Sequence, residues 1–194
     1  MRKIYFAHPV NTYNQPIEAS FLRLIAENIT GRLNLIENPN QPHHQAGYNK
    51  WAKRQKKSDT KHVGMSYYYD IVLPECSGCA AVAFLDGRLG LGVAGEAKWF
   101  IERQKPVWLI MPTHDPEASG VEEFIKNPSG GFFRVGFASE DEQQLILSND
   151  SKIVVPHEET RLRTWRTYGC EMRPYEEAHL VKMPIPEDFY PDSK

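Results

Sequence analysis

Glu96 is the residue whose surroundings in the sequence first suggest chemistry. It directly follows the glycine-rich run Gly90-Leu-Gly-Val-Ala-Gly95, and we expect it in the first turn of a helix over residues 95–104. The dipole and the unpaired amides of a first turn favour an ionised carboxylate. Such a carboxylate can act as a nucleophile toward an electron-poor carbon, and nearby glycines let a ligand approach the backbone. The alternative is ordinary helix stability, for which Glu is favoured in any first turn.

Tyr5, Asp70 and Asp86 can assist this carboxylate. Tyr5 lies in a predicted buried strand, where its hydroxyl needs a partner, and it can donate a hydrogen bond that orients Glu96. Asp70 is expected on a helix over residues 65–73, and Asp86 at the tip of the strand that follows it. An acid beside a leaving group can donate a proton to it. Two ordinary roles stay open: Asp70 as a solvated helix residue and Asp86 as part of a plain turn.

The run over residues 90–95 also spells G-x-G-x-x-G, a pattern typical of dinucleotide binding. Its context differs from that site, because the preceding strand is expected to end early, near Leu85, and the next strand ends at Met111-Pro112 without an acid for a ribose hydroxyl. The simpler interpretation is that these small residues let the helix pack closely against the sheet. A metal site at Cys76-Ser-Gly-Cys79 would need a second pair of ligands, and the sequence does not show whether His43-His44 or Cys170 lies near it, so we expect no metal and no cofactor.

The elements that must position these residues alternate along the first part of the chain. Short apolar runs bounded by turn residues predict strands, and apolar residues at helical spacing predict helices. Their alternation predicts an α/β fold with a parallel sheet flanked by helices, in which ligands bind beyond the carboxyl ends of the strands. The predicted strands are residues 3–7, 33–36, 79–85 and 106–111, and the predicted helices are residues 16–31, 65–73 and 95–104.

Two segments depart from this alternation. Residues 38–64 are polar and basic, and we expect a long surface loop there with a helical stretch around residues 48–56. Beyond residue 128 the pattern becomes irregular and partly β. We therefore divide the chain into an α/β domain over residues 1–128 and a C-terminal extension over residues 129–194, which packs on the same domain or on a partner subunit. The strand-like segments of the extension are residues 132–137, 152–155 and 160–168.

Composition and charge exclude several classes of protein. Lys plus Arg is 23 and Asp plus Glu is 25, and the resulting net charge of −2 argues against a nucleic-acid polymer as partner. The longest apolar stretches are far too short to span a bilayer, so we expect no membrane association. The first residues run straight into a predicted strand without a signal-peptide pattern, and three cysteines is an odd number. These features predict a cytoplasmic protein.

Four motifs follow one another along the chain: Lys3-Ile-Tyr-Phe-Ala7, Asp70, the segment from Gly90 to Ile101 that contains Glu96, and Lys105-Pro-Val-Trp-Leu-Ile110. In order and spacing they resemble the nucleoside 2-deoxyribosyltransferase family and its relatives that hydrolyse nucleotide N-glycosidic bonds. The resemblance implies a flavodoxin- or Rossmann-like parallel sheet flanked by helices. It also implies a small-molecule nucleoside or nucleotide as partner, and a homodimer or higher homo-oligomer, because members commonly complete each other's sites.

The same resemblance implies catalytic roles. In the family, the Glu at the position of Glu96 attacks the anomeric carbon and forms a covalent sugar–enzyme intermediate. The Tyr at the position of Tyr5 orients that Glu, and the acid at the position of Asp70 helps to protonate or hold the base. A second nucleobase or water then releases the sugar, with net retention after two inversions.

The glycine run departs from the family in two ways. Many members carry an acid at the position of Gly90; here Asp86 can replace it, or the base is handled differently. Val93 and Ala94 stand where hydrolases of 5′-monophosphates often have Ser or Thr, which leaves backbone amides for a phosphate. We expect Gly90, Gly92 and Asp86 to contact the substrate.

His8 and Asn11, in the loop after the first strand, replace small residues common in the family, and we expect them to contact the base or the sugar. The leading hypothesis is an enzyme that cleaves or transfers at an N-glycosidic bond. Two alternatives stay open. One is a non-catalytic module of the same fold that binds a nucleotide-derived ligand, which Gly90 in place of an acid favours. The other is a redox enzyme that uses the glycine run.

Overall fold

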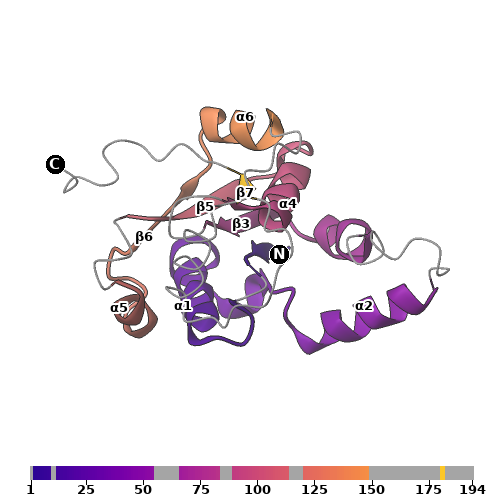
Figure 1. Ribbon diagram of the computed structural model, residues 1–194, viewed down its shortest axis with the longest axis horizontal. Helices are drawn as coiled ribbons and strands as arrows, with labels where there is room; N and C mark the ends of the chain where they lie inside the picture. Colours follow the sequence, from indigo (N-terminus) through magenta and orange to yellow (C-terminus); the bar gives the residue numbers. More distant parts are fainter. Residues whose placement is uncertain are drawn as a thin grey trace.

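The structure is a computed structural model that describes residues 2–9, 12–54, 66–83, 89–113, 120–148 and 180–181. Its centre is a five-stranded sheet in the order β2-β1-β3-β5-β6 (Figure 1). The first four strands in this order run parallel, and β6 runs antiparallel to β5. The predicted α/β fold with a largely parallel sheet is therefore confirmed, with one antiparallel edge. The strands are β1 (Ile4–Ala7), β2 (Ile36–Glu37), β3 (Gly78–Val82), β5 (Val107–Pro112) and β6 (Phe133–Phe137).

The direction in which strands are added reverses between β1 and β3. β2 follows β1 in the chain and lies on one side of it, whereas β3 lies on the other side. The connections that leave β1 and β3 consequently cross opposite faces of the sheet. In open α/β sheets the crevice at such a reversal, beyond the carboxyl ends of the strands, is where ligands bind.

One face of the sheet packs against α1 (Pro16–Ile25) and α5 (Gly120–Lys126). The fully buried ring of Phe21 lies 5.0 Å from that of Phe124, measured between ring centroids. A π-helical turn extends α1 to Gly31, whose φ of 71° ends the helix at the predicted residue. Apolar spacing and the terminal glycine were therefore sufficient to predict α1, whereas α5 was not predicted.

The opposite face packs against α4 (Leu91–Ile101), α6 (Glu140–Ser148) and a helical stretch over residues 66–75. Most of that stretch consists of the π-helix η4 (Tyr68–Val72) and the 3₁₀ turn η5 (Leu73–Glu75). We predicted an α-helix ended by the proline after residue 73; the proline instead lies inside the 3₁₀ turn, where its fixed φ is tolerated.

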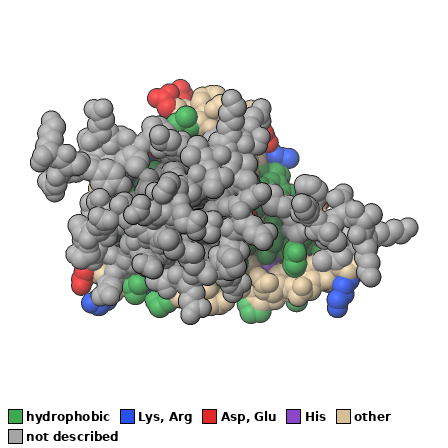
Figure 2. All heavy atoms as spheres, in the orientation of Figure 1, with side chains coloured by type: hydrophobic (Ala, Val, Ile, Leu, Met, Phe, Trp, Pro, Cys, Tyr) green, Lys and Arg blue, Asp and Glu red, His purple; other side chains and the backbone are tan. Residues whose placement is uncertain are grey.

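Helix α2 (Pro42–Arg54) extends away from the sheet (Figure 1, lower right). The rings of Tyr48 and Trp51, about one turn apart, both pack near the ring of Tyr67 in the helical stretch before β3. Basic side chains lie at the far end of α2 (Figure 2). The helix begins earlier than predicted, because Pro42 suits a first helical turn.

Other predicted boundaries also move. A 3₁₀ turn, η3 (Leu33–Leu35), precedes β2, so the second strand begins at Ile36 rather than at residue 33. Helix α4 begins at Leu91, inside the glycine run, rather than at residue 95 as predicted. The strand β4 (Leu89–Gly90) pairs with β7 (Leu180–Val181) in a separate two-stranded sheet.

The beginning of the predicted C-terminal extension joins the main sheet. β6 pairs with β5, and α6 packs on α4. The expected strand at residues 132–137 is thus confirmed, whereas those at residues 152–155 and 160–168 lie outside the described residues. Among the described helices, none combines the length and the apolar character needed to cross a bilayer.

Two glycines of α4 differ in what surrounds them, and this difference predicts opposite effects of alanine. A Cβ atom built at Gly92 meets nothing within 4 Å, whereas one at Gly95 lies 2.7 Å from the Tyr69 hydroxyl oxygen. Gly92→Ala should stabilise the protein by up to about 1 kcal/mol, because alanine favours the helix. Gly95→Ala should not, because the Tyr69 ring must move. Urea unfolding measures both variants, and equal stabilisation would contradict the contact.

Candidate functional site

Tyr5 and Glu96 meet on the α4 face of the sheet. Tyr5 is fully buried, and the alternation of side chains along β1 turns its ring toward α4. Its hydroxyl donates a hydrogen bond of 2.8 Å to Glu96 Oε1. Glu96 is partly exposed, so solvent can reach this residue. The predicted contact between phenol and carboxyl group is confirmed, while the catalytic roles of both residues stay predictions.

The electrostatic setting of Glu96 differs from the prediction. Because α4 begins at Leu91, Glu96 is its sixth residue and lies beyond the first turn, where the helix dipole acts. Burial raises the pKa of the Glu96 carboxyl group to about 8, and the hydrogen bond from Tyr5 opposes this rise only in part. The expectation of an ionised carboxylate at a helix start is therefore wrong. Near pH 7 the neutral acid is the major form.

Two tyrosines of η4 lie near this carboxyl group. Burial, followed by the charge of Glu96, raises the pKa of Tyr68 to about 12 and also raises the pKa of Tyr69. The Tyr69 hydroxyl additionally lies against Gly95, in the space that a side chain there would occupy. Both phenols are neutral at physiological pH, so these two tyrosines, like Tyr5, bring no charge near the Glu96 carboxyl group.

The other residues predicted for the site are less closely associated with this carboxyl group. Asp70 is exposed, and no hydrogen bond or ion pair joins it to another described residue. Gly90 precedes the first turn of α4 as its N-cap, and Gly92 is exposed within that turn. Asn11 and Asp86 lie outside the described residues.

His8 lies on the face of the sheet opposite to Glu96, because it shares the orientation of Phe6 in the alternation along β1. Its ring stacks on that of Phe6 with centroids 3.7 Å apart, and its Nδ1 lies 3.0 Å from the Phe6 carbonyl oxygen. Its Nε2 faces Glu18 Oε1 at 3.5 Å and makes no hydrogen bond within the described structure. The structure therefore associates His8 with α1 rather than with Tyr5.

Glu18 organises a polar cluster that we did not predict. Its Oε1 accepts a hydrogen bond of 2.7 Å from Asn38 Nδ2, and its Oε2 accepts one of 2.5 Å from the backbone of Asn14. The Asn40 side chain donates to both oxygens. Burial raises the pKa of Glu18, but contact with His8 and these hydrogen bonds outweigh it and hold the pKa at about 2. The ionised carboxylate thus ties the loop after β1 to the segment after β2.

Glu37, His43 and His44 form a second polar cluster, where β2 ends and α2 begins. Their potential ligand atoms all lie within 4.8 Å of one another, so this cluster can hold a cation. The adjacent histidines were visible in the sequence, but their glutamate partner was not. Cys76 and Cys79, for which we expected no metal, are buried free thiols.

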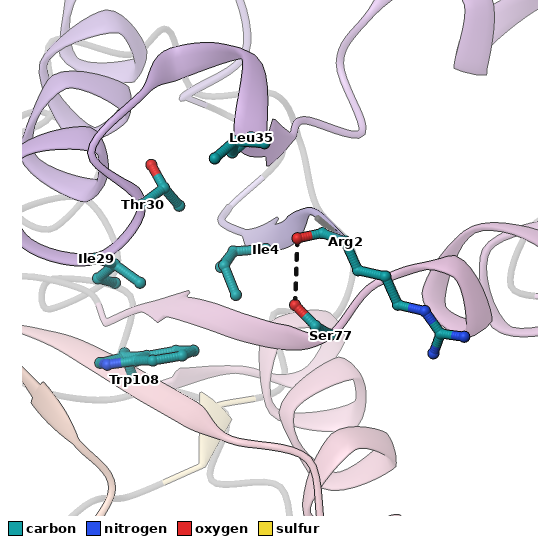
Figure 3. A pocket seen from close by; sticks show the side chains of 7 residues that line it. All are labelled: Arg2, Ile4, Ile29, Thr30, Leu35, Ser77 and Trp108. Carbon is teal, nitrogen blue, oxygen red and sulfur yellow. Dashed lines mark hydrogen bonds between the residues drawn. The ribbon is translucent and has the colours of Figure 1, made fainter.

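A cavity of about 420 Å³ lies at the amino ends of the parallel strands (Figure 3). Its walls are mostly apolar, and the Arg2 side chain points away from it (Figure 3). None of the residues predicted for the site lines it. Because open α/β sheets bind ligands at the carboxyl ends of their strands, we do not assign this cavity to the candidate site. It is lined by Arg2, Ile4, Ile29, Thr30, Leu35, Ser77 and Trp108.

Comparisons with known proteins do not identify a family for this chain. No protein-family model matches the chain, and neither curated proteins nor solved structures provide a match. The function of the site is therefore inferred from its residues and geometry.

Glu96 should titrate near pH 8 in the free protein. Tyr5→Phe should raise this midpoint further, because it removes the hydrogen bond that stabilises the anion. The folded pKa lies above the ordinary value of 4.5, so Glu96 should lower the stability of the protein as pH rises from about 4.5 through about 8. Carboxyl NMR follows the titration, with Glu96→Gln to assign the signal. A midpoint near 4.5 would contradict the buried setting.

Glu18 should give the opposite pH dependence. Its folded pKa of about 2 lies below the ordinary 4.5, so its stabilising contribution is present above pH 4.5 and is lost as pH falls toward 2. Glu18→Gln should lower stability at pH 7, on the order of a few kcal/mol, and flatten the stability profile between these pH values. Urea unfolding at several pH values measures this. A variant profile as steep as that of the wild type would show that other groups cause the acid sensitivity.

Proposed function

We propose that this protein cleaves or transfers the N-glycosidic bond of a nucleoside or nucleotide, with Glu96 as the nucleophile that attacks the anomeric carbon. The observation that carries this proposal is the 2.8 Å hydrogen bond from Tyr5 to Glu96 Oε1, which orients the carboxyl group and leaves Oε2 for attack. The reversal of strand order between β1 and β3 supports a flavodoxin- or Rossmann-like assignment of the fold and a ligand site at the carboxyl edge of the sheet.

The raised pKa of Glu96 is compatible with this reaction. Only a minor share of the carboxyl group is ionised near pH 7, because burial disfavours the isolated anion. In the transition state the sugar carries the positive charge of an oxocarbenium ion, and that charge beside the carboxylate offsets the cost of burial. The attraction is then stronger in the transition state than in the free protein, and only such differential stabilisation accelerates a reaction.

Attack forms a bond between Glu96 Oε2 and the anomeric carbon, while the bond to the base breaks and its electron pair stays on the base. The departing base must gain a proton, which water can supply. Asp70 is our candidate to hold the base or to assist this proton transfer, because its exposed side chain can meet a base that faces solvent. In the second step water or another base attacks the same carbon, releases Glu96 and restores the configuration. We expect a second copy of the chain to contribute to substrate binding.

A module that binds a nucleotide-derived ligand without turnover is the second candidate. The neutral form of Glu96 favours it, because a protonated carboxyl group can both donate and accept hydrogen bonds without attacking the ligand. Tight binding in calorimetry, with the ligand recovered intact, would favour this function over catalysis.

The test is release of free base from a panel of nucleosides and 5′-monophosphates, with and without an acceptor base. The rate should rise with pH through about 8 as Glu96 ionises, and Glu96→Gln should abolish it. Glu102→Gln, an exposed acid at the end of the same helix, is the matched control and should retain activity. Product that forms only with an acceptor identifies a transferase, and product in water alone identifies a hydrolase.

Absence of base release from every member of the panel would remove the proposal. Equal rates for the wild type and Glu96→Gln would remove it as well, since the carboxylate would then play no part in bond cleavage.

A further inference from the structure

Two imidazoles and one carboxylate converge where β2 ends and α2 begins. His43 Nε2 lies 3.4 Å from Glu37 Oε1, and His44 Nε2 lies 2.6 Å from the same oxygen. Zinc binds histidine nitrogens at about 2.0–2.1 Å and carboxylate oxygens at about 2.0–2.2 Å, so two ligands of one tetrahedral ion lie about 3.3 Å apart. The first distance already matches this spacing, the second must lengthen by about 0.7 Å, and the ligand atoms of all three residues lie within 4.8 Å of one another.

We propose that His43, His44 and Glu37 form a binding site for a divalent transition metal of the zinc class. Two histidines and one carboxylate are a donor set found in zinc sites that keep a fourth position for water or another ligand. The His43 side chain is 60% exposed, whereas those of His44 and Glu37 are 7% and 12% exposed. The site is thus anchored on its buried side and open to solvent on the side of His43.

The surrounding groups hold these ligands in suitable orientations. Lys3 Nζ lies 2.6 Å from Glu37 Oε2, which leaves Oε1 turned toward the histidines. His44 Nδ1 lies 3.4 Å from the Tyr67 hydroxyl oxygen, so the outer nitrogen of this ring has a polar partner. Partners of this kind fix the tautomer and the orientation of histidines that bind metals.

Metal binding requires a change of tautomer at His44. The Glu37 carboxylate only accepts hydrogen bonds, so the His44 Nε2 beside it carries the ring hydrogen in the metal-free state. A metal ion uses the lone pair of Nε2, and the ring hydrogen must then reside on Nδ1. From there it can be donated to the Tyr67 oxygen, which changes from donor to acceptor. No proton is lost from the ring in this exchange.

The local charge predicts which metals bind. The ammonium group of Lys3 and the positive end of the α2 dipole oppose any cation near Glu37. Coordination to the two imidazoles must therefore supply the affinity. Zinc and similar transition metals bind imidazole well, whereas magnesium and calcium prefer oxygen ligands. We expect zinc to bind and magnesium not to bind.

Calorimetric titration of the full chain, first stripped of metal with a chelator, tests the proposal. Zinc chloride should bind with one ion per chain and raise the melting temperature, and magnesium chloride should do neither. His43→Gln removes the exposed ligand without disturbing the core, and it should weaken zinc binding by about tenfold or more. Gln45→Ala changes an exposed residue two positions further along α2 and is the matched control, which should bind zinc as the wild type does.

Absence of zinc binding at micromolar concentration would overturn the proposal. Binding that keeps its affinity and stoichiometry in His43→Gln would overturn it too, because the ion would then lie on other residues. NMR of the ring nitrogens gives an independent measurement: zinc should shift the signals of His43 and His44 and reverse the tautomer of His44. Rings that do not respond to zinc would exclude this site even if the affinity changed.

Discussion

A buried carboxyl group must either accept hydrogen bonds that stabilise its charge or take up a proton. Glu96 accepts one hydrogen bond and is also partly protonated. Tyr5 donates to it at 2.8 Å, yet burial still raises its pKa to about 8. The rest of the candidate site depends on this pair. β1 must be buried on both faces to turn Tyr5 toward α4, and α4 must lack a side chain at Gly95 to admit the Tyr69 hydroxyl. The packing that places Tyr5 beside Glu96 and the raised pKa of Glu96 therefore have the same origin, which is the burial of this pair.

Local patterns in the sequence were sufficient for the sheet and for this central contact. The apolar runs predicted both ends of β1 and β5 to within one residue, whereas β3 begins one residue before its predicted start and ends at Val82 rather than at residue 85. A buried Tyr5 needed a partner, and this need led to Glu96. The start of α4 was missed because Gly90, Gly92 and Gly95 each disfavour a helix on their own. Packing of α4 against the sheet and η4 outweighs the low helix propensity of these glycines. The glycine run by itself does not reveal this packing.

The polar clusters were missed for a different reason. Glu18 and Asn38 are 20 residues apart in the sequence, and each alone resembles an ordinary surface residue. Only the pairing of β1 with β2 brings the segments after these strands together. The cluster of Glu37 with His43 and His44 has the same origin, because β2 delivers the carboxylate and the first turn of α2 delivers the imidazoles. Such contacts follow from topology, which periodicity along the chain does not encode.

The tyrosines before β3 link the two chemically distinct regions. Tyr67 lies beside the His44 ring, while its neighbours Tyr68 and Tyr69 lie near the Glu96 carboxyl group. Among the described residues no cation contributes to the pKa of Glu96; burial raises this pKa, and the hydrogen bond from the neutral Tyr5 hydroxyl lowers it. Its ionisation is therefore governed by how far packing excludes water from the carboxyl group. A movement of α2 that displaced Tyr67 would also displace the residues that follow it in the same helical turn. The charge of the proposed nucleophile is thus governed by helix packing rather than by an ion pair.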